Sequence, residues 1–235
     1  MPEAEFWTVL SLGFLLGARH ALDADHVVAV STLVARRSTL QISGLIGFSW
    51  GVGHTVVLLL TGIVVILLKV TIPEPLARAC EFGVGMMLVA LGGSLAWTLY
   101  HERWHMHTHR HDESTHVHLH SHILHEDHGH DHWLKLSVRP FLVGMAHGLA
   151  GSAALTLVVL SATRTLWGGI AYIAVFGIGS IVGMTLLGFL ISLPLLLSAS
   201  IGRRAQHAIQ ALASVGSIGL GLAIMVRTGL GESLF

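Results

Sequence analysis

The sequence predicts an all-α fold: a polytopic membrane protein with six transmembrane helices arranged as a 3+3 inverted repeat. Composition predicts the membrane class, because 53% of the 235 residues are hydrophobic and only 11% are charged, a balance that does not suit a soluble domain. Long stretches without charge predict the helices. A short similarity between the two halves of the chain predicts the repeat.

Six stretches are candidates for the transmembrane helices. A bilayer core about 30 Å thick requires roughly 20 apolar residues per helix. Five stretches without Asp, Glu, Lys or Arg reach this length, at residues 38–68, 82–101, 141–163, 165–202 and 205–226. A sixth, residues 6–34, is apolar at both ends but polar in its middle. Pro194 favours one tilted helix with an interfacial tail over two short helices in the fourth stretch.

The repeat rests on FLLGARHAL at residues 14–22, which matches FLVGMAHGL at residues 141–149 with an offset of 127 residues. The matched pairs are Phe14/Phe141, Gly17/Gly144, His20/His147 and Leu22/Leu149, and more loosely Gly53/Gly183 and Thr55/Thr185. Three helices per repeat make the second copy enter the membrane from the opposite side. We predict a first repeat at 1–100, a His-rich connection at 101–136 and a second repeat at 137–235. Chance similarity between Gly- and Leu-rich helices is the alternative.

Lys and Arg residues predict the orientation, because they are enriched in the cytoplasmic loops of membrane proteins. With both termini outside, the inner segments hold eight of these residues and the outer segments hold four. The inner ones are Arg36, Arg37, Arg103, Arg110, Lys135, Arg139, Arg203 and Arg204, and the outer ones are Lys69, Arg78, Arg164 and Arg227. We therefore expect a multi-pass protein of the bacterial cytoplasmic membrane, with its termini outside and the His-rich connection in the cytoplasm.

Charge and cysteine content exclude other classes. A formal net charge of zero offers no basic surface for nucleic-acid phosphates. Cys80 is the single cysteine, so an internal disulfide and a thiolate metal site are both excluded. Residues 1–5 contain two glutamates and no Lys or Arg, which argues against a removable signal peptide.

A polar cluster, RHALDADH at residues 19–26, interrupts the first apolar stretch. Each Arg or Asp near the centre of a transmembrane helix costs about 3 kcal/mol, so such residues usually serve a function. On an unbroken helix His20, Asp23 and His26 share one face, whereas Asp25 points elsewhere. Asp25 can join them only if the helix is broken, for which Gly13 and Gly17 are candidate positions, or if the ligand lies between helices.

The side chains of this cluster suit a divalent transition metal. Imidazole and carboxylate groups bind Ni, Co, Zn or Mn, and the lack of thiolates argues against copper(I). Arg19 lies one turn from Asp23 and is predicted to pair with it. A buried network of ion pairs that only fixes the helix is the alternative interpretation.

Two further histidines are candidate ligands. His54 lies in an apolar stretch, where a lone histidine is often a hydrogen-bonded core residue. His147 is the counterpart of His20 in the second repeat. The counterparts of the acidic positions are Ala150 and Ser152, so the second repeat offers fewer ligands.

These residues resemble the nickel/cobalt transporter (NiCoT) family. The family's defining element is His-x4-Asp-His, here His20, Asp25 and His26, and residues 48–56 resemble its second motif, in which a histidine corresponds to His54. The resemblance implies a permease for Ni²⁺ or Co²⁺ in which these residues bind the ion. Typical members are longer, with eight spans and a later Asp-Thr-Ala-Thr-type motif that is absent here. GMAHGLAGSAA at residues 144–154 is instead similar to the shorter urease-accessory nickel permeases.

The connection from residue 101 to 133 holds 13 of the 18 histidines. A tract without an apolar face is expected to be disordered in the absence of metal. We predict that it collects metal ions through His105, His107, His109, His111, His116, His118, His120 and His122. A solvated linker is the alternative. Residues 101–105 also match the His-Glu-x-x-His pattern of zinc proteases, a match that so many histidines produce readily by chance.

The predicted function is therefore uptake of Ni²⁺ or Co²⁺ by a permease that has no permanent cofactor and is not an enzyme. The ion is expected to bind between the two repeats, with Asp23 and Asp25 offsetting its charge and Arg19 holding the empty site, while the repeats rock. Nickel or cobalt efflux is one alternative, and an intramembrane metal-dependent hydrolase is another. The expected partners are the metal ion and the lipid bilayer, with a homo-oligomer and a metallochaperone for urease or hydrogenase also compatible with the sequence.

Overall fold

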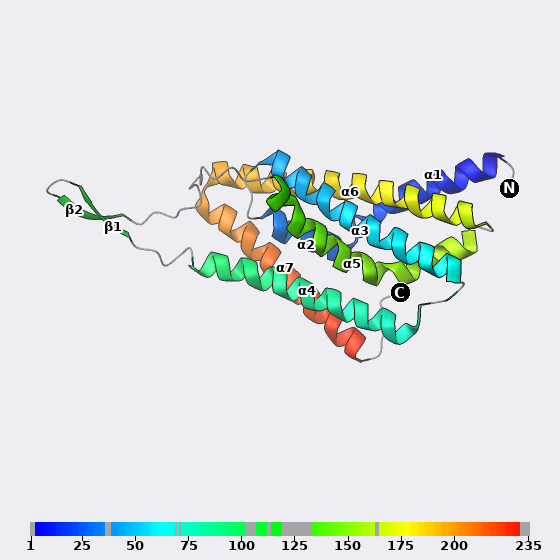
Figure 1. Cartoon of the computed structure of the whole chain (residues 1–235). Helices are drawn as coiled ribbons and strands as arrows, with labels where there is room; N and C mark the ends of the chain where they lie inside the picture. Colours follow the sequence, from blue (N-terminus) through cyan, green and yellow to red (C-terminus); the bar gives the residue numbers. More distant parts are fainter. Residues whose placement is uncertain are drawn as a thin grey trace.

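The computed structural model describes residues 3–35, 39–68, 70, 72–101, 107–111, 114–118, 133–162 and 165–230. In chain order the elements are α1 (Glu3–His20), α2 (Ala24–Val34), α3 (Leu40–Leu68), α4 (Glu74–His101), β1 (His107–His111), β2 (Ser114–His118), α5 (Trp133–Ala162), α6 (Leu166–Ile201) and α7 (Arg203–Gly229). The helices form one elongated body, and the two short strands lie beyond one end of it (Figure 1). The predicted helical class is confirmed for the body of the described chain.

Four of the helices, α3, α4, α6 and α7, are long and apolar enough to cross a membrane. They cover four of the stretches that the sequence predicts as spans. α6 is a single helix with Pro194 inside it, as predicted. The remaining two stretches form α5 and the pair α1 and α2. The arrangement as six spans remains a prediction.

Local chemistry explains where α6 begins and ends. The hydroxyl of Thr165 accepts a hydrogen bond from the backbone N–H of Gly168 at 3.1 Å and so caps the first turn. Gly202 follows the last turn with a φ of 138°, a conformation that favours glycine. The chain therefore reverses within one residue, and α7 begins directly at Arg203.

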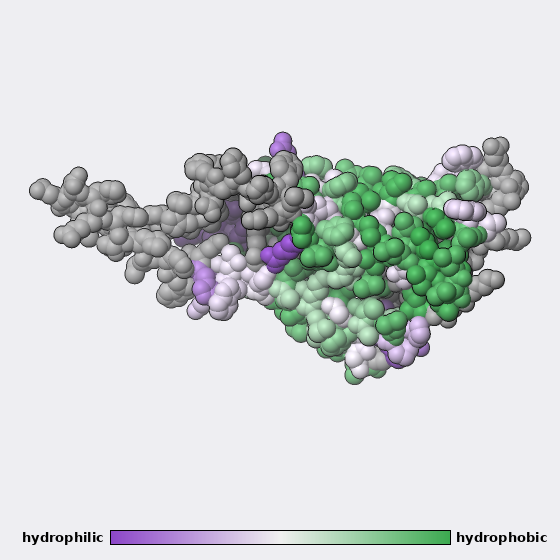
Figure 2. Space-filling view, in the orientation of Figure 1, coloured by the Kyte–Doolittle hydropathy of each residue, from purple (hydrophilic) through white to green (hydrophobic). Residues whose placement is uncertain are grey.

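The outer surface of the helical body is apolar. Figure 2 shows a broad hydrophobic face over the helices, with hydrophilic residues toward its ends. Large apolar side chains on several helices are exposed, among them Leu60, Ile178, Leu186, Leu212 and Val215. A soluble monomer rarely exposes apolar patches of this extent, so this surface fits contact with lipid.

Exposed aromatic residues lie near the two ends of the apolar surface. Trp7 and Trp167 are near the starts of α1 and α6, and both of these helices begin at the same end of the body (Figure 1). Trp97 and Tyr100 are in the last turns of α4, at the opposite end. Tryptophan and tyrosine are enriched at both membrane interfaces, and these four positions match such belts.

The helices pack in two groups. In the first group α3 packs against α5 and α6, and α1 packs against α6. The second group is the pair α4 and α7. The short helix α2 contacts α4, α6 and α7, so it lies between the two groups.

Glycines bring the backbones of the first group into close contact. A Cβ atom added at Gly17 would collide with the backbone of Phe176 in α6, and one added at Gly144 would collide with the backbone of Trp50 in α3. The hydroxyl of Ser180 donates a hydrogen bond to the carbonyl of Gly17 at 3.2 Å across the same α1–α6 contact. Small residues of this kind allow close packing of membrane helices.

Ten residues of the His-rich connection form an antiparallel hairpin that the sequence did not predict. His107 lies opposite His118, and His109 lies opposite His116. The predicted loop residues His105, His120 and His122 lie outside the described residues. Disorder of the connection without metal and the domain boundaries at 101 and 136 remain predictions.

The α3–α5 contact gives a first test of the packing. Gly144→Leu is expected to destabilise the protein by about 1–3 kcal/mol or more, because overpacked side chains force backbones apart. Gly93→Leu is the control, since nothing lies within 4 Å of a Cβ at that position. Thermal unfolding of the purified proteins in detergent measures both. Equal midpoints for the two variants would contradict the glycine contact.

Candidate metal-binding site

The site is built at a break between α1 and α2. α1 ends at His20, where the N–H of Leu22 donates to the carbonyl of Arg19 at 2.8 Å and the N–H of Asp23 donates to that of His20 at 3.0 Å. Asp23 is extended, and α2 begins at the next residue. The break therefore lies at residues 21–23 and not at Gly13 or Gly17, because both of these glycines lie in the middle of α1 against α6.

The break changes the position expected for Asp25. The carboxylate of Asp25 accepts a hydrogen bond from Nδ1 of His26 at 3.0 Å and one from Nε2 of His147 at 3.0 Å. The sequence allowed Asp25 to join the cluster only if the helix is broken or the ligand lies between helices, and the break between α1 and α2 meets the first of these conditions. Asp23 instead pairs with Nδ1 of His20 at 2.8 Å.

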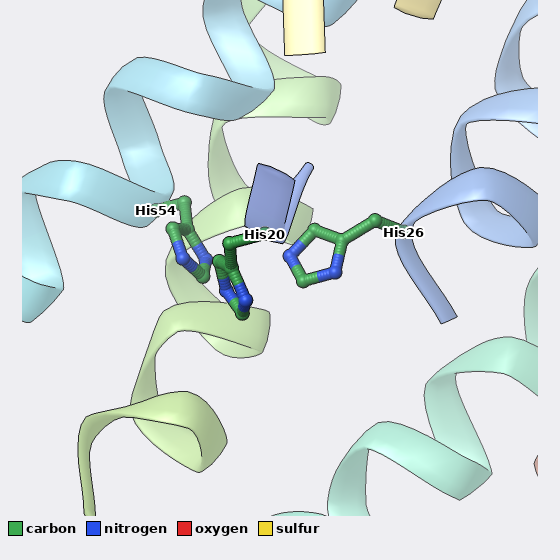
Figure 3. Close-up of side chains that lie close together, drawn as sticks. All are labelled: His20, His26 and His54. Atoms are coloured by element: carbon green, nitrogen blue, oxygen red, sulfur yellow. The ribbon is translucent and has the colours of Figure 1, made fainter. Parts of the chain in front are cut away.

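Four histidines from four helices meet at this point. The ring centroid of His26 lies 4.5 Å from that of His20, 5.3 Å from that of His54 and 4.2 Å from that of His147. Figure 3 shows the rings of His20, His26 and His54 turned toward one another. His26, His54 and His147 are buried, with exposed fractions of 1%, 0% and 2%.

Several of the buried ring nitrogens have no hydrogen-bond partner among the described residues. They are Nε2 of His26, both nitrogens of His54 and Nδ1 of His147. Buried polar atoms in folded proteins almost always have a partner. A metal ion would supply the missing partner. Asp23 holds one nitrogen of His20, and Asp25 holds one nitrogen of His26 and one of His147, which leaves the other nitrogen of each ring for a metal, the arrangement common at metal sites.

The ligand atoms form two overlapping groups. The first group is His20, His26 and His54, and the second is Asp25, His26 and His147; within each group the ligand atoms lie within 4.8 Å of one another. Two ligand atoms on opposite sides of an ion, each about 2.1 Å from it, are about 4.2 Å apart. Small side-chain shifts would therefore bring the ligand atoms of either group within binding distance of one ion. Nitrogen and carboxylate donors suit Ni²⁺, Co²⁺ or Zn²⁺.

A cavity of about 30 Å³ lies beside the second group, which is room for an ion or a water molecule. Its lining consists of His20, Asp25, His26, Glu81, Val84, His147, Ala150, Gly151 and Ile224. These residues come from both helix groups, so the cavity lies between the α4–α7 pair and the rest of the body. Aromatic rings cover other parts of the histidine cluster. The ring centroid of Trp50 lies 5.5 Å from that of His147, and the ring centroid of Phe176 lies 5.6 Å from that of His20.

The structure brings together most of the predicted ligands. His54 and His147 join His20, Asp25 and His26, whereas Asp23 is half-exposed and reaches the cluster through His20. Arg19 is exposed, and the predicted ion pair with Asp23 is not formed.

The sequence analysis missed Glu81. It is buried in α4, with an exposed fraction of 5%, and lines the cavity. It was overlooked because a charged residue was taken to lie outside the apolar stretch that begins at residue 82. In the structure α4 begins eight residues before that position, at Glu74.

The fold and the site define a class: a helical membrane protein whose apolar body contains a buried cluster of histidines and a carboxylate suited to a divalent metal ion. The chain belongs to the NicO family, described as high-affinity nickel-transport protein, whose model matches residues 6–224. This confirms the resemblance that the sequence indicated and places the chain among nickel-transport proteins, which are not enzymes.

Three relatives illustrate the family relationship. Urease accessory protein UreH of Bacillus sp. strain TB-90 is 36% identical over 236 residues, covering 100% of this chain and 98% of the relative. Chloroplast protein FOR GROWTH AND FERTILITY 2 of Arabidopsis thaliana is 26% identical over 232 residues, covering 97% of this chain and 58% of the relative. High-affinity nickel-transport protein NixA of Helicobacter pylori is 35% identical over 64 residues, covering 26% of this chain and 19% of the relative. No solved structure matches the chain.

A substitution of His54 tests whether this residue is an ion ligand or a structural core histidine. His54→Leu is expected to leave the metal-free midpoint unchanged or to raise it, because two buried nitrogens without partners are replaced by apolar atoms. The same variant is expected to lose most of the rise in midpoint that Ni²⁺ causes by binding the folded state. Thermal unfolding of purified protein with and without Ni²⁺ measures both effects.

His207→Leu is the matched control, since His207 lies in α7 outside the cluster. It is expected to keep the Ni²⁺-dependent rise. A large loss of metal-free stability in His54→Leu, with the Ni²⁺ effect retained, would show that His54 is a structural residue.

Proposed function

We propose that this protein is a permease that carries Ni²⁺, with Co²⁺ as a second candidate, into the cell across the cytoplasmic membrane. The observation that carries the proposal is the set of buried histidine nitrogens without partners at a helix break inside an apolar body. Family membership supports nickel as the cargo. The ion would bind to His20, His26, His54, His147 and Asp25, while Asp23 orients His20.

The six-span inverted repeat is part of the proposal. The contact of α1 with α6 has a counterpart in the contact of α5 with α3, and α3–α6 and α4–α7 are their own counterparts. This is the pattern of a two-fold relation between α1, α3, α4 and α5, α6, α7.

Glycine contacts support the same relation in detail. The contact of Gly17 with Phe176 corresponds to that of Gly144 with Trp50, and the contact of Gly179 with Phe14 corresponds to that of Gly53 with Phe141. The offsets are 127 residues for α1 and α5 and 126 for α3 and α6. These contacts favour Gly179 over Gly183 as the counterpart of Gly53, so Ser180 is the proposed counterpart of His54.

The proposed orientation places the His-rich connection in the cytoplasm. The start of α1 and the end of α7 lie toward one end of the body, and the end of α4 and the start of α5 lie toward the other (Figure 1). Arg139, Arg203 and Arg204 lie on elements at the second end, and Arg78 and Arg227 lie at the first. This agrees with the excess of Lys and Arg expected on the cytoplasmic side.

The packing suggests which parts move. Rocking of whole repeats would disrupt the close α1–α6 and α3–α5 contacts, because each joins one repeat to the other. Movement of the α4–α7 pair against the first group leaves those contacts intact and opens the cavity between them. The ion would step between the two ligand groups by exchanging partners around His26, which belongs to both.

Efflux remains the alternative direction, and the acidic pair Asp23 and Asp25 favours uptake. Assembly into a homo-oligomer and delivery of the ion to a metallochaperone are part of the proposal. The name of the Bacillus relative, a urease accessory protein, makes urease the first candidate for the receiving enzyme.

Uptake is tested by the accumulation of radioactive nickel in cells. His20→Ala, Asp25→Ala and His26→Ala are expected to abolish accumulation, because each removes a ligand or the group that holds two ligands. Asp23→Asn is expected to reduce it only partly, about 10-fold or less, since Asp23 acts on the ion through His20. Each variant is compared with the wild type at equal amounts of protein in the membrane.

The same cells distinguish the direction of transport. Uptake predicts that expression raises cellular nickel and lowers tolerance to added nickel. Lower cellular nickel and higher tolerance would establish efflux, and wild-type accumulation by all three alanine variants would remove the site from the mechanism.

Single cysteines test the orientation. Cys80→Ser gives a cysteine-free background in one step, because Cys80 is the only cysteine in the sequence. A cysteine at residue 4 or 232 is expected to react with a membrane-impermeant maleimide in intact cells, whereas one at residue 113 is expected to react only after the cells are opened. The reverse pattern would invert the proposed orientation.

A further inference from the structure

Glu81 is an acidic residue that lines the cavity together with Asp25 but belongs to none of the motifs found in the sequence. It lies in α4, about two turns from the start of the helix at Glu74. Its exposed fraction is 5%, and it shares the cavity lining with Asp25, His26 and His147. A carboxylate buried within a membrane helix is costly, so such a residue usually has a function.

The position of Glu81 complements an asymmetry between the repeats. His20 and His147 are counterparts, but the acidic residues that follow His20 have Ala150 and Ser152 as counterparts. Ala150 lines the cavity beside His147, where it offers no oxygen ligand. Glu81 comes from α4, lines the same cavity and supplies a carboxylate that α5 does not.

The cavity lies closer to the second ligand group than to the first. All three members of the second group, Asp25, His26 and His147, line it together with Glu81, whereas His54 of the first group does not, although His20 and His26 do. The other lining residues from the α4–α7 pair are Val84, one turn after Glu81, and Ile224, which lies about one and a half turns before the end of α7. Glu81 is thus on the side of the cluster that faces the start of α4 and the end of α7.

We propose that Glu81 is an oxygen ligand for Ni²⁺ at a second ion position, in the cavity between the α4–α7 pair and the Asp25–His26–His147 group. This inference rests on the proposed function. An ion at this position is held by Glu81 together with Asp25 and His147, and it passes to the His20–His26–His54 group when His26 changes partners. Because Glu81 lies on the α4–α7 pair, movement of that pair carries one ligand toward the cluster or away from it.

Protection from chemical modification tests the position without a mutation. Purified full-length protein in lipid nanodiscs is treated with dicyclohexylcarbodiimide, an apolar reagent for buried carboxyl groups, and labelling is measured by peptide mass spectrometry. Ni²⁺ is expected to lower labelling of Glu81 at least 3-fold, whereas Mg²⁺ leaves it unchanged. Glu74, whose side chain is 70% exposed, is the internal control and is expected to be unaffected by Ni²⁺. Equal labelling of Glu81 with and without Ni²⁺ overturns the inference.

Transport kinetics provide a second readout in proteoliposomes. Glu81→Gln is expected to raise the KM for Ni²⁺ about 10-fold, as for other losses from a metal's ligand environment, with a smaller change in the maximal rate. Glu81→Asp keeps the carboxylate and is expected to restore part of the affinity. Glu74→Gln is the matched control on the same helix. A KM for Glu81→Gln equal to that of Glu74→Gln contradicts the inference.

The two experiments separate this inference from the proposed function. Nickel transport by the wild type without protection of Glu81 overturns the second position alone. Protection of Glu81 in a protein that does not transport nickel supports the position and overturns the permease. If Glu81→Gln does not reach the membrane, the labelling of the wild type decides.

Discussion

The structure depends on how a membrane protein tolerates a broken helix inside its apolar body. Backbone groups and charges without partners are costly in lipid. Here the turn at residues 21–23 satisfies part of the backbone with two short-range hydrogen bonds, and Asp23 and Asp25 are each held by histidines. The break therefore turns the end of α1 and the start of α2 toward the same point, and the metal-binding groups follow from that geometry.

The two helix groups are packed more tightly within themselves than against each other, and the candidate site lies where they meet. The first helix group is held by backbone contacts at glycines, which leave little room for movement between α1, α3, α5 and α6. The α4–α7 pair has close contacts of its own, including those of Ser214 and Ser217 with the backbone of α4, but meets α5 and α6 less extensively. The cavity lies along this weaker junction, so access to the ion and the most movable contact coincide in the proposed mechanism.

The sequence predicted the helical segments and most of the residues that the structure brings together in the candidate site, because hydropathy and intramembrane charges are strong signals. It could not locate the break, since glycines that pack against a neighbouring helix look the same in sequence as glycines that interrupt one. The sequence therefore left open whether Asp25 reaches the cluster through a broken helix or through a site between helices. Glu81 was missed because a carboxylate at the edge of an apolar stretch is assigned to a loop unless the neighbouring helices are known.

The overlap of the two ligand groups bears on how a transport site differs from a structural metal site. A structural site encloses its ion with a fixed set of ligands, and an ion held that way leaves slowly. Here the candidate ligands come from α1, α2, α3 and α5, and His26 belongs to both groups. In the proposed mechanism an ion therefore replaces one partner at a time without ever losing all of them. Such stepwise exchange would keep the barrier to release low, while imidazole nitrogens favour a transition metal over Mg²⁺ or Ca²⁺.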